Sequence, residues 1–244
     1  MKTLCLLLAL LCSQYCLAAG QSITLAAAEY PPYTTATDPA GGLIGAIARA
    51  AFAQRGISLR LSFRPWVRAL SEVQNGHFDG LLGLWYSQER SGFLYFSLPI
   101  YNTTLGFFSR CDHRVNVSEL AQLRTLRIGT VQGYKNPDSF EQAGLHSVDA
   151  EDDMSNLYKL AAGRLDLVLI DREVAQYLQR QAKPALSVPL CWEEPPLEVM
   201  PLHIAFSRHK TESGRLLTEF SQGLTALHQS GEYERILRHY GATP

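Results

Sequence analysis

The sequence predicts an α/β protein made of two similar lobes. In both halves of the chain, strand-type apolar segments alternate with helix-type segments, a pattern typical of parallel sheets covered by helices. An internal repeat is the second observation: LSEVQNGHFDGLLGLW, residues 70–85, returns as LYKLAAGRLDLVLID, residues 157–171. Gly76 and Asp79 are matched by Gly163 and Asp166 at a constant offset of 87 residues (163 − 76 and 166 − 79). The repeat indicates equivalent units in the two lobes, in which Gly permits a positive φ and Asp bonds the turn backbone.

The first half of the chain gives a strand-helix-strand-helix-strand series. The helix at 43–56 repeats apolar residues at helical spacing and ends at Gly56, a suitable C-terminal cap. Pro65 is suited to the first position of the next helix. In order, we expect a strand, a Pro- and Gly-rich loop, a helix, a strand, a helix and a strand over residues 22–29, 30–42, 43–56, 57–63, 65–76 and 78–85.

From Thr125 the series starts again, and the last part of the chain returns to the first lobe. The second series predicts strands at 125–131, 146–149 and 165–170 and helices at 136–144 and 154–162; the final part predicts a strand at 201–208 and helices at 212–231 and 232–241. Residues 20–101 and 203–244 then form one lobe and residues 102–202 the other. The two crossings, near 101–104 and 200–203, predict a hinge, and a cleft between two lobes is a common place for small ligands.

The first 19 residues match a secretory signal peptide. Lys2 precedes an apolar run, and a small-residue segment follows it, with cleavage expected after Ala18 or Ala19. The alternative, a membrane anchor, needs about 20 apolar residues, and Ser13 and Gln14 interrupt this run too early. The mature chain is therefore predicted to be exported to the periplasm and soluble.

Composition excludes several classes of function. Without Lys2, 21 basic residues (22 − 1) face 23 acidic ones, which argues against nucleic-acid binding. Cys111 and Cys191 are the cysteines left after cleavage; an oxidising compartment favours a disulfide between them, and two free thiols are the alternative. Histidines and cysteines show no metal-binding spacing, and no nucleophile elbow is present, so we expect no metal, cofactor or catalytic residue.

Two charged residues follow the buried strands that end each repeat unit. Because ligands in α/β sheets bind beyond the carboxyl ends of strands, Arg90 and Asp171 are candidate ligand contacts. Facing each other across a cleft, a guanidinium and a carboxylate would recognise a zwitterion such as an amino acid. The structural alternatives are that Ser87 caps a short helix carrying Arg90 in its first turn, and that Asp171 caps its own helix.

A third segment, GTVQGYKNPDSF, contributes Gly133, Tyr134 and Lys135 at the end of a strand. Backbone N–H groups opening toward a helix would suit an anion there, although the spacing of a phosphate-binding loop is absent. Aromatic residues also gather at strand and helix ends. They form either part of the core or a wall that lines a ligand: Tyr30, Tyr33, Trp66, Trp85 and Tyr134.

The order of these motifs resembles the bacterial extracellular solute-binding proteins of family 3. The motifs are EYPPYT, PWVRALSEVQNGHFDGLLG, SQERSGFLYFSLPIY, RIGTVQGY, LAAGRLDLVLIDREVA and GEYERILRHYG, which together cover the mature chain. The resemblance implies the two-lobed type II fold of periplasmic receptors that serve polar amino acid ABC importers. It also implies that Arg90 grips the ligand α-carboxylate, that Asp171 holds the α-amino group, and that Tyr30 or Tyr33 stacks on the ligand.

The chain departs from the family pattern at three places. Gly83 and Trp85 stand where small hydroxyl residues usually precede the arginine motif, and Lys135 stands near the position of a further hydroxyl. The helix segment GLIGAIARA lacks the usual acidic residues. An added cation and aromatic ring would favour a more acidic or larger solute.

Two other functions fit the same scaffold. Periplasmic dehydratases acting on cyclohexadienyl carboxylates resemble it, and in such an enzyme Glu173 or Lys135 would serve as the acid. A sensor module that presents its ligand to a receptor kinase is the other. We expect a monomeric binding protein with a small-molecule ligand and an ABC permease as possible partner.

Overall fold

The computed structural model describes residues 21–243, so the predicted signal peptide lies outside the described residues. Its elements are β1 (Ser22–Ala27), α2 (Leu43–Ala53), β2 (Ser58–Phe63), α3 (Trp66–Gln74), β3 (Gly80–Trp85), α4 (Gln88–Ser91), β4 (Leu94–Phe96), β5 (Tyr101–Arg110), η1 (Leu120–Leu123), β6 (Ile128–Val131), α5 (Asp138–Gln142), β7 (Ser147–Ala150), α6 (Asp153–Ala161), β8 (Leu167–Asp171), α7 (Arg172–Gln181), β9 (Leu190–Trp192), β10 (Glu198–Ser207), α8 (Ser213–Ser230) and α9 (Glu232–His239).

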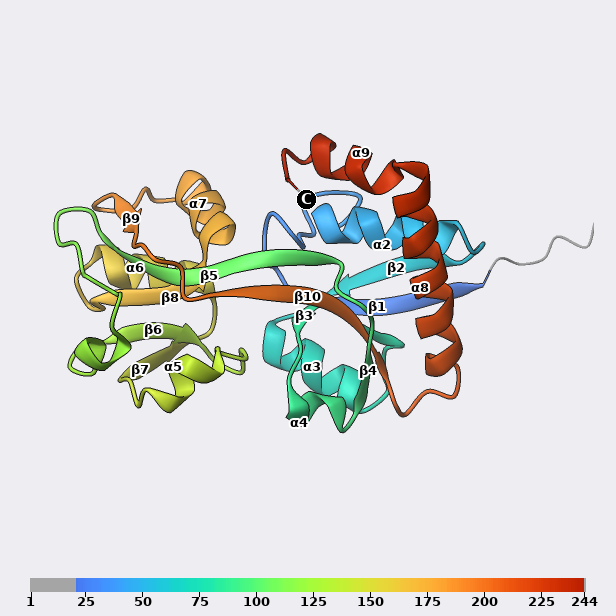
Figure 1. Cartoon of the computed structure of the whole chain (residues 1–244), viewed down its shortest axis with the longest axis horizontal. Helices are drawn as coiled ribbons and strands as arrows, with labels where there is room; N and C mark the ends of the chain where they lie inside the picture. The colour runs from blue at the N-terminus through green and yellow to red at the C-terminus, as the bar shows by residue number, and fades with distance from the viewer. Residues whose placement is uncertain (1–20, 244) are drawn as a thin grey trace, which may run out of the picture.

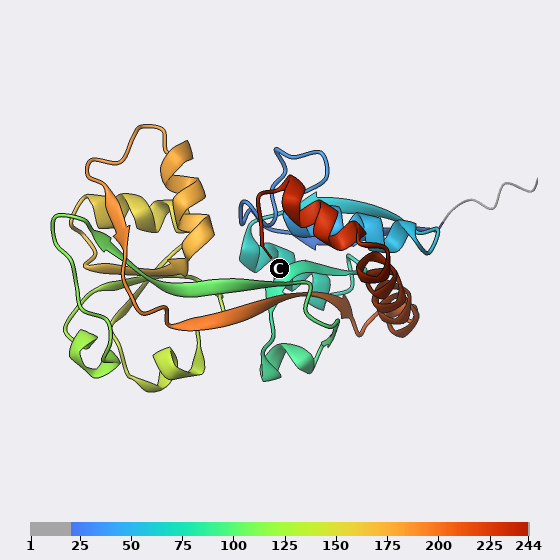
Figure 2. The same ribbon diagram turned by 45° about the horizontal axis from the view of Figure 1, so that its top comes forward.

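Two long strands, β5 and β10, connect the two lobes (Figure 1). They pair with each other antiparallel, from Glu198 opposite Leu105 to Leu202 opposite Tyr101. On one side β10 continues the sheet into β3, β1 and β2; on the other β5 continues it into β8, β6 and β7. The turned view shows the same two strands bridging the lobes (Figure 2). The hinge with two crossings is thus present, while the predicted lobe boundaries, which fall within these strands, stay a prediction.

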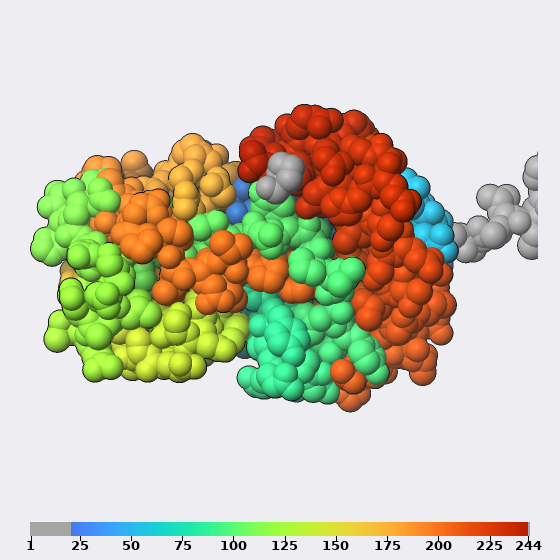
Figure 3. All heavy atoms as spheres, viewed as in Figure 1, coloured from blue at the N-terminus to red at the C-terminus, as the bar shows by residue number. Residues whose placement is uncertain are grey.

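Within each lobe the core strands run parallel. β1 pairs with β2 and β3, and β6 pairs with β7 and β8. The carboxyl ends of the strands of both lobes therefore point toward the space between the lobes, as the predicted cleft requires. Side by side in the space-filling view, the lobes meet without a wide gap on the face shown (Figure 3).

Alternate residues of β1 and β3 pack on opposite faces of the first sheet. Leu25 and Leu82 belong to the core that includes α2 and α8, whereas Ala26 and Leu81 belong to a smaller core under α3. Because both faces are covered, successive apolar residues of these strands are buried, as in Leu25–Ala27 and at Leu81 and Leu82. In residues 21–243, no helix combines the length and apolar character needed to cross a bilayer.

The sequence repeat corresponds to the same contact in both lobes. The Asp79 carboxylate accepts from the backbone N–H of Thr24 at 2.8 Å, and the Asp79 N–H donates to the Thr24 carbonyl at 3.0 Å. Asp166 forms the same pair of bonds with Arg127, at 2.8 and 2.9 Å. Gly76 and Gly163 both have positive φ, 73° and 70°. The repeated residues are structural: each aspartate fixes the start of a neighbouring strand.

Cys111 and Cys191 form a disulfide. Cys111 follows β5 and Cys191 lies in β9, with their Cα atoms 5.0 Å apart. Of the two readings that the sequence left open, the disulfide is the one that the structure contains.

Several element boundaries differ from the prediction. The helix expected at 136–144 is reduced to the five residues of α5, because Pro137 has an extended ψ of 145° and Gly144 follows the C-cap with a positive φ of 62°. The helix expected from Met154 begins one residue earlier, at Asp153. Strands β4, β5 and β9 and the helix η1 were not predicted.

Candidate functional site

Four segments that follow parallel strands meet between the lobes. The first lobe contributes the loop after β1 with Tyr30 and Tyr33, and the segment after β3 with Ser87 and Arg90. The second lobe contributes the segment after β6 and the start of α7. All of the candidate ligand residues predicted from the sequence lie on these segments, on the neighbouring end of β3, or at the first residue of α3.

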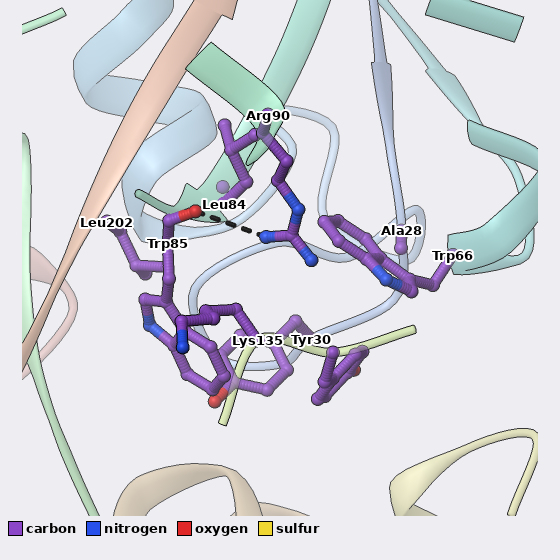
Figure 4. A pocket seen from close by; sticks show the side chains of 10 residues that line it. Ala28, Tyr30, Trp66, Leu84, Trp85, Arg90, Lys135 and Leu202 are labelled. Atoms are coloured by element: carbon purple, nitrogen blue, oxygen red, sulfur yellow. Dashed lines mark hydrogen bonds between the residues drawn. The ribbon is translucent and has the colours of Figure 1, made fainter. Parts of the chain in front are cut away.

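Arg90 is a buried guanidinium without an acidic partner. Its residue is 6% exposed, and within residues 21–243 it forms no ion pair. Nη1 donates to the carbonyl of Trp85 at 3.1 Å, and the guanidinium lies 5.1 Å from the ring centre of Trp66 (Figure 4). Nη2 donates to the carbonyl of Gly133 at 2.8 Å. Burial lowers the pKa of Arg90. A buried cation satisfied by neutral carbonyls is a setting that an anionic ligand would improve.

Ser87 takes the structural role that the sequence left open. Its side-chain oxygen accepts from the Arg90 N–H at 3.1 Å and so caps α4. This short helix turns the Arg90 side chain toward the cleft. Ser87 thus positions the arginine through the backbone.

An aromatic box fills the centre of the cleft; we use this name for Tyr30, Trp66, Trp85 and Tyr134. Tyr134, from the second lobe, lies among the three aromatic rings of the first, at 6.1 Å from Tyr30, 5.6 Å from Trp66 and 5.9 Å from Trp85. Each of these pairs is edge-to-face, with interplanar angles of 82°, 87° and 84°. Such pairs add to the energy of burial, so the box contributes to holding the lobes together.

Asp171 caps α7 from inside the protein. It is fully buried; Oδ1 accepts from the N–H of Val174 at 3.0 Å, and Oδ2 from the N–H of Thr104 at 2.9 Å. The hydroxyl of Tyr33, from the other lobe, donates to Oδ1 at 3.1 Å. Burial raises the pKa of Asp171 to about 7, although these hydrogen bonds lower it. The capping role is therefore present, and the proposed contact with a ligand ammonium would be added to it.

Asp153, which the sequence did not single out, lies beside the aromatic box. It is 6% exposed at the first position of α6, and Tyr134 donates to its Oδ2 at 3.2 Å. Burial raises its pKa to about 7. A pair of aspartates before a helix is typical of capping. Because a cap needs only one aspartate, the second one is the sequence signal that could have singled out Asp153.

Two small cavities lie on either side of the aromatic box. Tyr30, Trp85 and Tyr134 line both of them. One, of about 20 Å³, also touches Arg90; the other, of about 10 Å³, also touches Asp153 and Asp171. Each has room for about one water molecule. The rings therefore separate the buried cation from the buried carboxylates.

The cleft widens outside this closed centre. A hollow of about 590 Å³ is lined by Ser87, Arg90 and Lys135, and another of about 490 Å³ by Tyr33, Tyr101 and Glu173.

The Gly133–Lys135 segment contacts the first lobe through a carbonyl group, and its predicted role as an anion site stays a prediction. Gly133 has φ of +75° and presents its carbonyl to Arg90 and Trp66 rather than an N–H to a ligand. Lys135 pairs with Asp138 at 2.5 Å. Pro137, the N-cap of α5, has no N–H, and the acidic side chains of Asp138 and Glu141 lie in the first turn, so an anion at this helix start would meet negative charge.

Gly83 has a backbone reason for its identity. Its φ is +79°, and an added Cβ would lie 2.9 Å from Ile44 Cδ1. A hydroxyl residue, usual for the family pattern, would be strained here. In residues 21–243, no group of three or more acidic, His or Cys side chains is placed to hold a metal.

The sequence matches the bacterial extracellular solute-binding proteins of family 3 over residues 23–243, nearly the whole of the described chain. The chain belongs to this family. No curated protein matches the sequence of this family 3 protein.

Solved structures similar to this family 3 protein share its two-lobed, periplasmic-binding-protein-like fold. One is a histidine kinase sensor domain with similarity to periplasmic binding proteins, at TM-score 0.79 and 23% identity, covering 90% of this chain and 95% of that one. Another is a mutant of ArgBP from T. maritima, at TM-score 0.75 and 18% identity over 90% and 94%. A third is the ancestral amino-acid-binding protein AncCDT-1, a precursor of cyclohexadienyl dehydratase, at TM-score 0.71 and 18% identity over 89% and 95%.

Proposed function

We propose that this protein is a periplasmic receptor that closes its two lobes around an amino acid. Two buried charges carry the proposal: Arg90 of the first lobe has no carboxylate partner, and Asp171 of the second has no cationic partner among residues 21–243. Both face the same cleft. A zwitterion would supply the missing anion to Arg90 and the missing cation to Asp171, and would therefore favour the closed form.

The aromatic box would recognise the rest of the ligand. Its rings offer apolar faces that enclose a side chain, while the hydroxyls of Tyr30 and Tyr33 lie on the side of Asp171. Because Tyr134 now lies among the rings of the first lobe, the lobes must separate, or Tyr134 must move, before a solute enters. Closure around the ligand would then be the signal that a membrane partner reads.

Family membership supports the remaining parts of the proposal. Members are extracellular solute-binding proteins, which agrees with a cleaved signal peptide, a periplasmic location and an ABC permease as partner. The similar structures include a kinase sensor domain, so sensing is the second use that closure would serve. The predicted acids of the dehydratase alternative do not favour catalysis, since Lys135 is paired with Asp138 and Glu173 is exposed.

A thermal-shift screen against the common amino acids tests the proposal. At about 1,000 times its dissociation constant, a ligand stabilises a protein by about 4 kcal/mol. We expect a shift with one class of amino acids, abolished by Arg90→Ala and retained by Arg68→Ala, a matched control at an exposed arginine of α3. An equal shift in both variants, or none with any amino acid, would contradict the proposal.

A further inference from the structure

The position of Asp153 is not explained by its helix. An acidic residue near a helix N-terminus is common, because it can bond free N–H groups and favour the dipole. Here that role belongs to Asp152, which is exposed and accepts from the Ser155 N–H at 2.7 Å. Asp153 lies one residue later, buried between the lobes. A second acidic residue placed where desolvation is costly calls for a different reason.

A hydroxyl without a hydrogen-bond partner faces the small cavity beside Asp153. Tyr30 is 6% exposed, and its hydroxyl forms no hydrogen bond in the described structure. The cavity of about 10 Å³ that it lines also touches Asp153 and Asp171. A buried hydroxyl without a partner is rare and costs free energy. Together with two carboxylates, it provides oxygen acceptors for a ligand that donates hydrogen bonds.

The charges of the closed centre do not balance for a neutral zwitterion. Arg90 is the buried cation, and Asp153 and Asp171 are the buried carboxylates. A zwitterion would neutralise Arg90 and Asp171 and leave Asp153 alone. The other titratable groups that influence Asp153 are Tyr134, Asp152 and Asp171, none of which is a cation. A further positive charge on the ligand would complete the balance.

We propose that Asp153, with the Tyr30 hydroxyl, forms a second cation subsite and that the solute is a basic amino acid, with a side chain ending in an ammonium or guanidinium. The proposal rests on the amino-acid-binding function proposed above. Entry of the side-chain cation displaces the hydroxyl of Tyr134, now bonded to Asp153 at 3.2 Å. The rings of the aromatic box then surround the cation, and their faces attract it.

This assignment reverses the preference suggested by the sequence. Lys135 was expected to favour an acidic solute, but its charge is matched by Asp138. An acidic side chain entering the cavity would instead meet two carboxylates. The desolvated like charges would repel it, since the low local dielectric strengthens both attraction and repulsion.

Titration calorimetry with L-lysine and L-norleucine tests the proposal, because the two differ by the terminal ammonium. We expect the purified protein to bind lysine at least tenfold more tightly than norleucine. Asp153→Asn should reduce this ratio to about one, while Asp152→Asn, at the exposed neighbour, should leave it unchanged. A ratio near one in the unaltered protein, or a ratio that survives Asp153→Asn, would overturn the proposal.

Further variants separate this proposal from the proposed function. Arg90→Ala should weaken both amino acids by a similar factor, because both carry the α-carboxylate. If both bind with Arg90 dependence and equal affinity, the receptor function stands and the cation subsite falls. If neither binds, cadaverine, a diamine without a carboxylate, decides: binding lost in Asp153→Asn but kept in Arg90→Ala supports the subsite, and no binding overturns it.

Tyr134→Phe provides a second variant should Asp153→Asn fail to fold. It removes the hydroxyl that competes for Asp153 and keeps the ring in the aromatic box. The ratio of lysine to norleucine affinity should rise. An unchanged or lower ratio would count against the subsite.

Discussion

The guanidinium of Arg90 and the carbonyl of Gly133 lie 2.8 Å apart across the cleft, one from each lobe. The indole N–H of Trp66 donates to the same carbonyl, also at 2.8 Å. We call these two bonds the interlobe latch. Since Arg90 is the proposed carboxylate-binding group, the latch uses the donors that a ligand would take. The closed form without ligand and the closed form with ligand therefore differ in what Arg90 binds.

Weakening the latch should open the ligand-free protein. Trp66→Phe keeps an aromatic ring but removes the N–H that reaches Gly133. A lost hydrogen bond of about 1 kcal/mol corresponds to an approximately fivefold shift toward the open form. Small-angle scattering should then show a larger radius of gyration. Tyr86→Phe is the control, because its hydroxyl bonds Gln88 within the first lobe; equal radii in both variants would count against the latch.

The Tyr33 hydroxyl should set the pH range in which Asp171 binds a cation. A hydrogen bond donated to a carboxylate stabilises its ionised form, so the Tyr33 hydroxyl lowers the pKa of Asp171. Tyr33→Phe removes this bond and should raise that pKa further above about 7. Amino-acid affinity measured by calorimetry from pH 6 to 9 should therefore reach its plateau at a higher pH. Tyr101→Phe is the control, because the Tyr101 hydroxyl bonds the Thr243 carbonyl, and it should keep the pH profile of the unaltered protein. If Tyr33→Phe also kept that profile, the role of Tyr33 would be refuted.

Asp153 should make the ligand-free protein less stable as the pH rises. Its pKa is about 7 in the folded protein, above the usual 3.8, so between about pH 4 and 7 the folded state binds more protons than the unfolded state. The free energy of unfolding contributed by this group is present at low pH and is lost as pH rises through 7. Asp153→Asn removes that loss.

Thermal melting at pH 5 and pH 8 checks this effect. The free energy of unfolding of Asp153→Asn minus that of the unaltered protein should be larger at pH 8 than at pH 5, by about 1–4 kcal/mol. The pKa of buried His203 is lowered, which acts in the opposite direction below pH 6.5, but it is common to both proteins and cancels. Asp152→Asn leaves Asp153 buried and removes only one of the smaller causes of its raised pKa, so its gain should be smaller. A constant difference in melting temperature would mean that Asp153 is not desolvated as the structure shows.

The sequence predicted the two-lobed fold and pointed to the candidates Arg90 and Asp171 because these features depend on local pattern. Arg90 and Asp171 were found from their place after buried strands, which parallel sheets bring to one edge. β5 was missed because its pattern changes along its length: Asn102 is exposed at the hinge, whereas Phe107 and Phe108 are buried in the second lobe. A strand that passes between two environments has no single alternation to read.

Asp153 was missed for a different reason. Its importance depends on which side chains the closed lobes place around it, above all Tyr30, which lies 123 positions earlier (153 − 30). The role of Gly133 likewise depends on Arg90 and Trp66 of the other lobe. Contacts between lobes follow from the position of the hinge, and no local periodicity encodes them.

The repeated aspartates offer a test of the structural reading of the repeat. Asp79→Ala and Asp166→Ala each leave a backbone N–H, of Thr24 or of Arg127, without its acceptor. A buried polar group left unsatisfied costs about 1–3 kcal/mol. The Thr24 bond is partly buried and the Arg127 bond is exposed, so Asp79→Ala should lower the free energy of unfolding by about 1 kcal/mol or more and Asp166→Ala by less, and both variants should unfold at a lower denaturant concentration. Asp166 also forms an exposed ion pair with Arg127, which adds little. Ligand affinity should be unchanged in both, because neither carboxylate faces the cleft. A loss of affinity at unchanged stability would assign these residues to the site instead.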